Sequence, residues 1–309
     1  GDGERNTKKV SSNSKKGGKR AKFKVIDQLK SKYPIAKICK TLNVSRAGYY
    51  KYLKNKGKKK RESNRDKELK EYITLVYYEH HMNFGYRKIH GELQDTYNLP
   101  VSEKIVRRLM KELGLKSQAR KKRAKSVNGN KVTSAGHIYQ NLLKRDFSTT
   151  KLSEKWVTDV TEVPVGNKKL YLSALMDLHD NQILGYKLSE VHDVKLVEDT
   201  LTAALKTRKI QKGLILHSDQ GMPYRSNRWK ELIDEYKITP SMSRKANALD
   251  NACIESFFSF LKAERKELKT VKVIERAKQI IHEYMYYYNH KRIQGVLNYM
   301  TPANYAKAS

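Results

Sequence analysis

The feature that most restricts the fold of this chain is a change of hydrophobic pattern at Trp156. Before it, apolar residues recur at helical spacing. After it come three extended segments rich in Val, Leu, Tyr and Thr, at residues 156–165, 170–176 and 183–188. The turn-forming pairs Gly166-Asn167 and Asp180-Asn181 separate them. We therefore predict an antiparallel three-stranded meander that follows an all-helical part of the chain.

Helices and short strands alternate after the meander. Helical periodicity covers residues 193–207 and 226–236, and a further helix carries Ile254, Phe257, Phe258 and Leu261 on one face. Short apolar runs at 214–216 and around Ile238 are typical of buried strands. Meander, helix, strand, helix, strand, helix is the element order of a ribonuclease-H-like α/β fold. We assign this core to residues 151–267, followed by a C-terminal helical extension over 268–309.

The N-terminal part is strongly basic. Residues 1–61 hold 21 Lys and Arg against 3 Asp and Glu, more than half of the excess behind the net charge of +33. Residues 1–22 have the composition of a disordered basic arm or of the end of a longer upstream segment. Residues 23–60 predict a helix-turn-helix, in which Ser45 caps a helix that begins with Arg46.

A second helical unit is predicted over residues 61–116. Its last helix would place Ile105, Val106 and Leu109 inside, with a basic outer face that fits either a solvated surface or a DNA recognition helix. Residues 117–150 have the composition of a polar, basic linker. The candidate DNA-contacting residues of these regions are Arg46, Arg87, Lys88, Lys104, Arg107, Arg108, Lys111, Arg120 and Arg123.

Three acids occupy unusual positions in the predicted α/β core. Asp159 lies inside a strand, where a charge is costly unless it is paired or bound to a metal. Asp219 directly follows the next core strand, at the end where α/β sheets bind ligands. Glu255 lies on the helix after the last strand, and 35 residues separate it from Asp219. These positions single out the three carboxylates as candidate functional residues.

The composition narrows the class of partner. A chain of pI about 9.9 with 65 Lys and Arg favours a polyanion as its partner. No apolar run approaches the length of a membrane span. Cys39 and Cys253 are far apart in sequence, which excludes a disulfide scaffold and gives no support for a structural zinc site. Nucleic acid is therefore the leading partner, in a cytosol-like compartment.

At this point the sequence resembles a known family. It is similar to the second-frame transposases of bacterial two-reading-frame insertion sequences, of the retroviral-integrase superfamily, over roughly residues 25–309. The matching segments are 156–161, 217–221, 241–244 and 250–258, together with Tyr288, Asn289, Arg292 and Thr301-Pro302. Two departures are visible: Ala246 and Ile293 stand where the family usually has Gly and Pro.

The resemblance implies a mechanism and its participants. Asp159, Asp219 and Glu255 would hold two Mg²⁺ ions, with Mn²⁺ as a substitute, and Asp159 would bridge them. The protein would cut and join 3′ ends by the copy-out, paste-in route, acting on the inverted repeats of an element and on target DNA. It would assemble as a dimer or larger homo-oligomer on paired ends and lie in the bacterial cytoplasm, associated with the nucleoid.

Further residues complete the prediction. Arg244, Lys245 and Arg292 are added as DNA contacts, and His217, Asn251, Tyr288 and Asn289 as supporting residues. Asn251 fits either a residue that orients Glu255 or a helix cap, and the tyrosines fit core packing equally well. A structure-selective nuclease of the same fold and a non-catalytic DNA-binding regulator remain as alternative functions.

Overall fold

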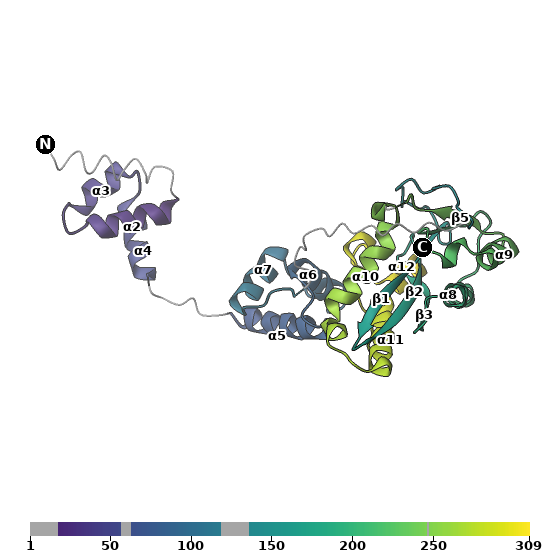
Figure 1. The fold of residues 1–309 in the computed structure, drawn as a ribbon. Coiled ribbons are helices and arrows are strands. Elements are labelled where there is room, and N and C mark those ends of the chain that lie inside the picture. Colours follow the sequence, from purple (N-terminus) through teal and green to yellow (C-terminus); the bar gives the residue numbers. More distant parts are fainter. Residues whose placement is uncertain (1–17, 57–62, 119–135, 246) are drawn as a thin grey trace. The chain divides into compact units, whose positions relative to one another are not determined.

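The computed structural model describes residues 18–56, 63–118, 136–245 and 247–309 and forms two compact units, residues 1–63 and 64–309 (Figure 1). Most of the predicted basic arm, Arg120, Arg123 and Ala246 lie outside the described residues. Among helices in the described ranges, none combines the length and hydropathy of a membrane span.

The first unit is a small three-helix domain. Its helices are α2 (Lys19–Leu29), α3 (Ile35–Thr41) and α4 (Arg46–Asn55). The Ser45 hydroxyl accepts a hydrogen bond from the Gly48 amide and caps α4, as predicted. The arm prediction is wrong for residues 19–22, because they form the first turn of α2, whose Phe23 packs on the core of the unit. That core consists of Ile26, Ile38, Cys39, Leu42 and Tyr49.

The second unit begins with a helical domain of α5 (Asn64–Glu79), α6 (Tyr86–Asp95) and α7 (Glu103–Glu112). Its apolar cluster includes Ile73, Ile89 and Leu109, and Ile293 reaches into the same cluster from the C-terminal part of the chain. The His80 ring also lies 3.2 Å from the hydroxyl of Tyr287, in the C-terminal part of the chain. These contacts fasten the helical domain to the α/β core.

The α/β core is built on one five-stranded sheet in the order β3-β2-β1-β4-β5. The meander pairs antiparallel, and β4 and β5 then add in parallel to β1. The order and directions agree with the predicted ribonuclease-H-like fold. The strands are β1 (Lys155–Val165), β2 (Lys168–Asp177), β3 (Ile183–Ser189), β4 (Ile215–Ser218) and β5 (Thr239–Met242).

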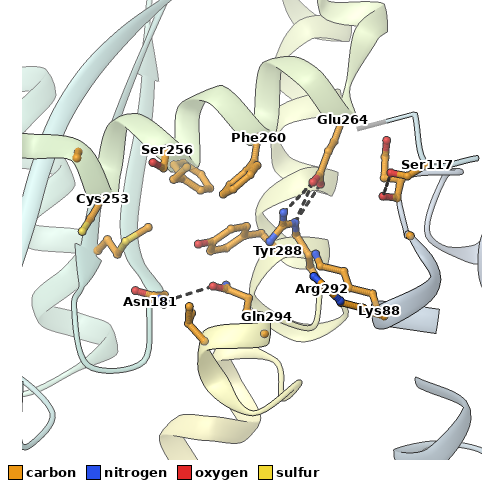
Figure 2. A pocket seen from close by; sticks show the side chains of 18 of the residues that line it. Lys88, Ser117, Asn181, Cys253, Ser256, Phe260, Glu264, Tyr288, Arg292 and Gln294 are labelled. Atoms are coloured by element: carbon orange, nitrogen blue, oxygen red, sulfur yellow. Dashed lines mark hydrogen bonds and ion pairs between the residues drawn. The ribbon is translucent and has the colours of Figure 1, made fainter. Parts of the chain in front are cut away.

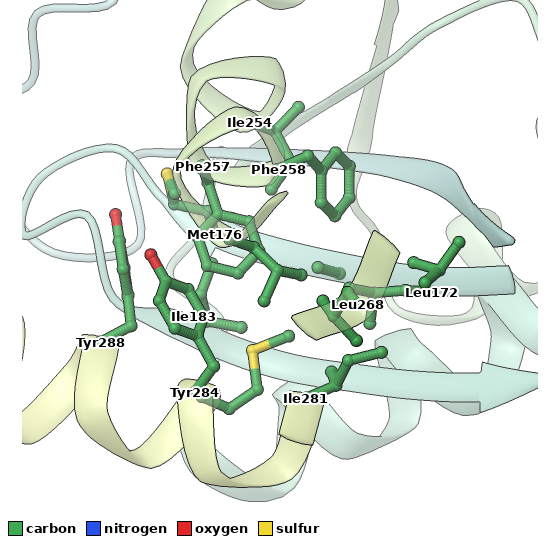
Figure 3. Packing of buried hydrophobic residues seen from close by; sticks show 14 of the residues in the cluster. Leu172, Met176, Ile183, Ile254, Phe257, Phe258, Leu268, Ile281, Tyr284 and Tyr288 are labelled. Carbon is green, nitrogen blue, oxygen red and sulfur yellow. The ribbon is translucent and has the colours of Figure 1, made fainter. Parts of the chain in front are cut away.

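Helices cover both faces of this sheet (Figure 1). On one face, Trp156 packs with residues of α8 (Val194–Thr207) and α9 (Asn227–Glu235). On the other, Val157 packs with α10 (Ala252–Glu264) and α11 (Ile274–His290), which Figure 3 shows at close range. The segment expected as an extension thus supplies α11 to the main core. Short helices complete the chain: η1 (Pro223–Arg225), η2 (Ala248–Asn251), η3 (Lys266–Lys269), η4 (Gly295–Leu297) and α12 (Pro302–Ala308).

Part of the predicted linker packs on the core. Leu143 is buried in the cluster beneath α10 and α11. The Asn141 amide and the Arg145 guanidinium both donate hydrogen bonds to Asp250, at 2.9 Å each. The described end of this segment, from residue 136 onward, therefore belongs to the core.

Candidate active site

The strand register brings Asp159 and Asp219 together. In the parallel pairing of β1 with β4, Val157 lies opposite His217. Two residues further along each strand, the same offset places Asp159 beside Asp219, just past the carboxyl end of β4. Both side chains are only partly exposed.

The third acid comes from α10. Glu255 lies in the first turn of that helix and is exposed. The start of the helix is tied to β1, because the Asn251 side-chain amide donates a 3.3 Å hydrogen bond to the carbonyl of Thr158, the residue before Asp159. Asn251 occupies the N-cap position of α10 but makes no side-chain cap bond. The capping interpretation of Asn251 is therefore wrong, and its contact links α10 to the strand that carries Asp159.

The three carboxyl groups repel one another. Loss of water raises the pKa of Asp159 well above its usual value, and the charges of Asp219 and Glu255 raise it further. Loss of water also raises the pKa of Asp219 and of Glu255, and the charge of Asp219 adds to the effect on Glu255. A group of carboxyl groups that disfavour their own ionised forms is typical of a cation site.

The donor set fits a hard divalent cation, whose preferred ligands are carboxylate oxygens. The side chains are not gathered around one point, however. Within the described ranges, no three His, Cys, Asp or Glu side chains are close enough together to hold one ion. The fit to a metal therefore rests on the charge and the chemistry of the three acids.

Two further side chains that act on the acids were not predicted from the sequence. The Lys262 ammonium lowers the pKa of Asp159 and donates a 2.6 Å hydrogen bond to the Thr161 hydroxyl on β1. His192 acts in the same direction on Asp219. Lys262 is seven residues after Glu255, so the periodicity of α10 could have revealed it on the same face. No sequence signal marked His192, which lies in the connection between β3 and α8.

His217 is held as a neutral structural group. Its ring nitrogens lie 2.8 Å and 3.0 Å from the hydroxyls of Ser241 and Ser243, and burial lowers its pKa to about 4. These bonds connect β4 to β5 and to the segment that leads toward α10. His217 therefore supports the frame around Asp219.

One predicted DNA contact is contradicted by the structure. Arg292 is 5% exposed, and its guanidinium pairs with both carboxylate oxygens of Glu264. It also stacks 4.4 Å from the Phe260 ring centroid. Its partner lies 28 residues earlier in the sequence, so only the tertiary fold reveals the pair.

The two supporting residues before Arg292 are structural as well. Tyr288 is buried in the main core, which agrees with the core-packing alternative. The Asn289 side chain accepts a hydrogen bond from the Ile183 amide at 3.0 Å and donates one to the Ile183 carbonyl at 2.9 Å. Both residues fix α11 against the meander.

The remaining DNA-contact candidates differ in how far they are engaged within the protein. Lys104, Arg107 and Lys111 are exposed on α7, and Arg46 is exposed at the start of α4. Three others are partly committed: Arg108 pairs with Asp66 and Glu112, Arg244 pairs with the buried Asp250, and Lys88 packs over the Phe84 ring. Arg87 and Lys245 are exposed.

Comparison with known proteins identifies the parts of this chain. Residues 150–248 and 255–309 match the family described as Integrase core domain, and residues 63–123 match the HTH-like domain. The chain thus combines a helix-turn-helix-like domain with an integrase core.

Relatives that match along almost their whole length identify the family of the chain more narrowly. The putative transposase InsK of insertion sequence element IS150 from Escherichia coli (strain K12) is 37% identical over 92% of this chain and 97% of the relative. A transposase-like protein from Haemophilus influenzae is 40% identical over 71% of this chain and 98% of its own length. The chain belongs to this family of insertion-sequence transposases, as its sequence motifs indicated.

Among solved structures, the catalytic core domain of HTLV-2 integrase in complex with magnesium aligns with a TM-score of 0.42 and 14% sequence identity. The alignment covers 50% of this chain and 97% of the integrase domain.

Proposed function

We propose that this chain is a DNA transposase that binds the ends of its insertion sequence, cuts their 3′ ends and joins them to a new strand. The observation that carries the proposal is the placement of Asp159 beside Asp219 by the β1–β4 register, with Glu255 supplied by the helix tied to β1. Membership of the insertion-sequence transposases supports the same chemistry.

Asp159, Asp219 and Glu255 are the residues that would hold two Mg²⁺ ions, or Mn²⁺ as a substitute. Bound there, such ions would activate the attacking oxygen and stabilise the leaving oxygen of an in-line displacement at phosphorus. The protein contributes the fixed frame: the sheet sets the two aspartates, and Asn251 sets the start of the helix that carries Glu255. Lys262 lies on the same helix and would face the phosphate backbone with a positive charge.

DNA binding would fall mainly to the helical parts. The basic residues Lys104, Arg107 and Lys111 of α7 and Arg46 of α4, all exposed, would contact phosphates and base edges. The substrates would be double-stranded element ends with inverted repeats and target DNA. We expect two or more copies of the chain on paired ends, in the bacterial cytoplasm.

The test compares Glu255→Gln, Asp159→Asn and Asp219→Asn with the unmodified chain. Each substitution keeps the size of the side chain but removes a charged oxygen ligand. We expect DNA binding to persist in a band-shift assay, while cutting and joining of labelled ends in Mg²⁺ fall by about a hundred- to a thousandfold, a loss typical of a removed electrostatic catalytic group. Glu235→Gln, at the end of α9, serves as the matched control.

The outcome also separates the alternative functions. Joined products would identify a transposase, and DNA that is cut but not joined would identify a nuclease. The absence of both products would identify a DNA-binding regulator. Joining at the unmodified rate by all three variants would remove the triad from the mechanism.

A further inference from the structure

A large groove lies between the helical domain and the α/β core of the second unit. Its volume is about 800 Å³, and its surface is mainly apolar. One wall is α6, another is the face of α10 that carries Ser256 and Phe260, and the segment around η4 adds Val296 (Figure 2). The volume is within the usual range of about 300–1,000 Å³ for small-ligand sites.

The groove carries an excess of positive charge. Of its described lining residues, Arg87, Lys88 and Arg292 are cationic and Glu264 is acidic. Arg292 and Glu264 pair with each other, as Figure 2 shows, so the single carboxylate of the lining is shared between Arg292 and Lys88. Burial and the charge of Arg292 lower the pKa of Lys88 to about 7, against the opposing charge of Glu264. An anion bound in the groove would favour the charged form of Lys88.

The groove and the candidate active site share one helix. Glu255 lies on α10 between Cys253 and Ser256, both of which line the groove. Successive residues of a helix are separated by about 100° around its axis, so Ser256 lies about 100° from Glu255 and Ala252, another lining residue, about 60° from it, and the two sites meet at the first turn of α10. A DNA strand bound at the carboxylates can therefore continue over the first turns of α10 into the groove.

We propose that the groove binds one unpaired nucleotide of the DNA strand held at the carboxylate site, with its base against the apolar wall of α10 and its phosphate beside Lys88. This inference rests on the proposed function. Single-stranded nucleic acid is bound with little sequence preference where its bases stack on aromatic side chains and cations lie beside its backbone. A purely apolar protein segment would leave the excess positive charge of the groove unmatched.

The test is a fluorescence titration of the full chain in EDTA, so that no cutting occurs. The probe is a duplex ending in one unpaired 2-aminopurine nucleotide, compared with a blunt duplex of the same length. We expect the unmodified chain to prefer the overhanging duplex by about tenfold, the lower range of one base-stacking contact, with a change in 2-aminopurine emission.

Two variants locate the effect. Ser256→Trp should fill the groove, and Lys88→Met should remove the charge while keeping the length of the side chain. Both should abolish the preference and the emission change. Thr202→Trp and Lys206→Met, on the exposed side of α8, are the matched controls and should keep both. Should Ser256→Trp fail to fold by circular dichroism, Lys88→Met decides.

The inference is overturned if the unmodified chain does not prefer the overhang, or if both groove variants keep the preference. It is also overturned if Ser256→Trp instead changes the mass of the DNA-free protein in sedimentation, which would assign the groove to a contact between copies. Mg²⁺-dependent joining by the unmodified chain is measured separately. Joining without an overhang preference removes only the nucleotide site, whereas triad variants that still join remove the proposed function.

Discussion

At the scale of single residues, the candidate site concentrates negative charge that the fold leaves largely unbalanced. Asp159 has lost most of its water and lies within the fields of Asp219 and Glu255, and among the groups acting on it Lys262 is the cation. The ionised form of Asp159 is therefore less favourable in the folded chain than in the unfolded chain. Its raised pKa lowers stability progressively as the pH rises from the unfolded pKa through the folded one.

Asp159→Asn should consequently stabilise the protein at neutral pH in EDTA. The size of this gain measures the shift of the Asp159 pKa between the two states, at about 1.4 kcal/mol for each unit. The gain should shrink in acid, where the carboxyl group of the unmodified chain is protonated too. Thermal unfolding at the two pH values measures it, and Asp95→Asn on the surface of α6 should have no effect. A loss of stability at neutral pH would contradict the electrostatic account.

The effect of an added metal ion on stability is a second prediction for the same site. A cation that binds only the folded chain raises its free energy of unfolding. The increase grows with the logarithm of the metal concentration once that concentration exceeds the dissociation constant. We expect Mg²⁺ to raise the melting temperature of the unmodified chain and to have a much smaller effect on Asp159→Asn. Equal shifts in both proteins would place the bound ion elsewhere.

At the scale of elements, α10 decides where Glu255 lies. Its inner face, with Ile254, Phe257, Phe258 and Leu261, is buried against the sheet (Figure 3). Glu255 is exposed at the edge of this face, and its charge raises the pKa of Asp159. Packing of the inner face therefore sets the position of a neighbouring catalytic candidate on the same helix.

Phe258→Ala should destabilise the second unit by about 3–5 kcal/mol, because the ring is 4% exposed and its removal leaves a cavity. Urea unfolding measures the loss. Tyr286→Ala on α11 removes a ring that is 62% exposed and should change stability by less than about 0.5 kcal/mol. Similar values for the two variants would show that the α10 face is not buried as described.

The contact between β3 and α8 is limited by a glycine. A Cβ atom at Gly185 would lie 2.5 Å from the Thr200 carbonyl oxygen and from the Ala204 amide nitrogen, both backbone atoms of α8. Gly185→Ala should therefore push α8 from the sheet and cost about 1–3 kcal/mol. Gly295→Ala meets no atom within 4 Å and is the control. A neutral Gly185→Ala in thermal unfolding would contradict this close approach.

The elements of the core could be predicted from the sequence, because each depends on local periodicity. The observed strand ends differ from the predicted ones by a few residues only. Asp159, Asp219 and Glu255 were selected by their positions in the predicted strands and helix. The pairing of Arg292 with Glu264 could not be predicted, since neither residue differs locally from a surface charge. The packing of residues 136–150 was missed for a related reason: Leu143 is one of few apolar residues in a polar stretch, and only the core shows where it goes.

At the scale of the whole molecule, charge and chemistry are divided between the two units. Residues 1–61 carry 21 basic and 3 acidic residues, whereas the candidate active site lies in residues 64–309. The first unit has a hydrophobic core made only of its own residues. It can therefore be removed without opening the core of the second unit.

Removal of residues 1–63 should weaken DNA binding and make it less sensitive to salt. Each neutralised phosphate contributes about 0.9 to the slope of log affinity against log salt, so the slope should become shallower by that amount for every phosphate that the first unit binds. Binding titrations at several salt concentrations compare residues 64–309 with the full chain, and circular dichroism checks that the shorter chain is folded. An unchanged slope would show that the first unit does not contact DNA.

The joint between the helical domain and the core has one more consequence. Ile293 inserts into the cluster of α5 to α7, His80 meets Tyr287, and the Lys266 ammonium donates to the Gln118 side chain at 2.8 Å. With α7 anchored in this way, the distance between Asp159 and a DNA segment bound by that helix would be fixed by the fold. The helical domain would then determine the position of the cut along the element, and the protein would not need to recognise the bases at the cut itself.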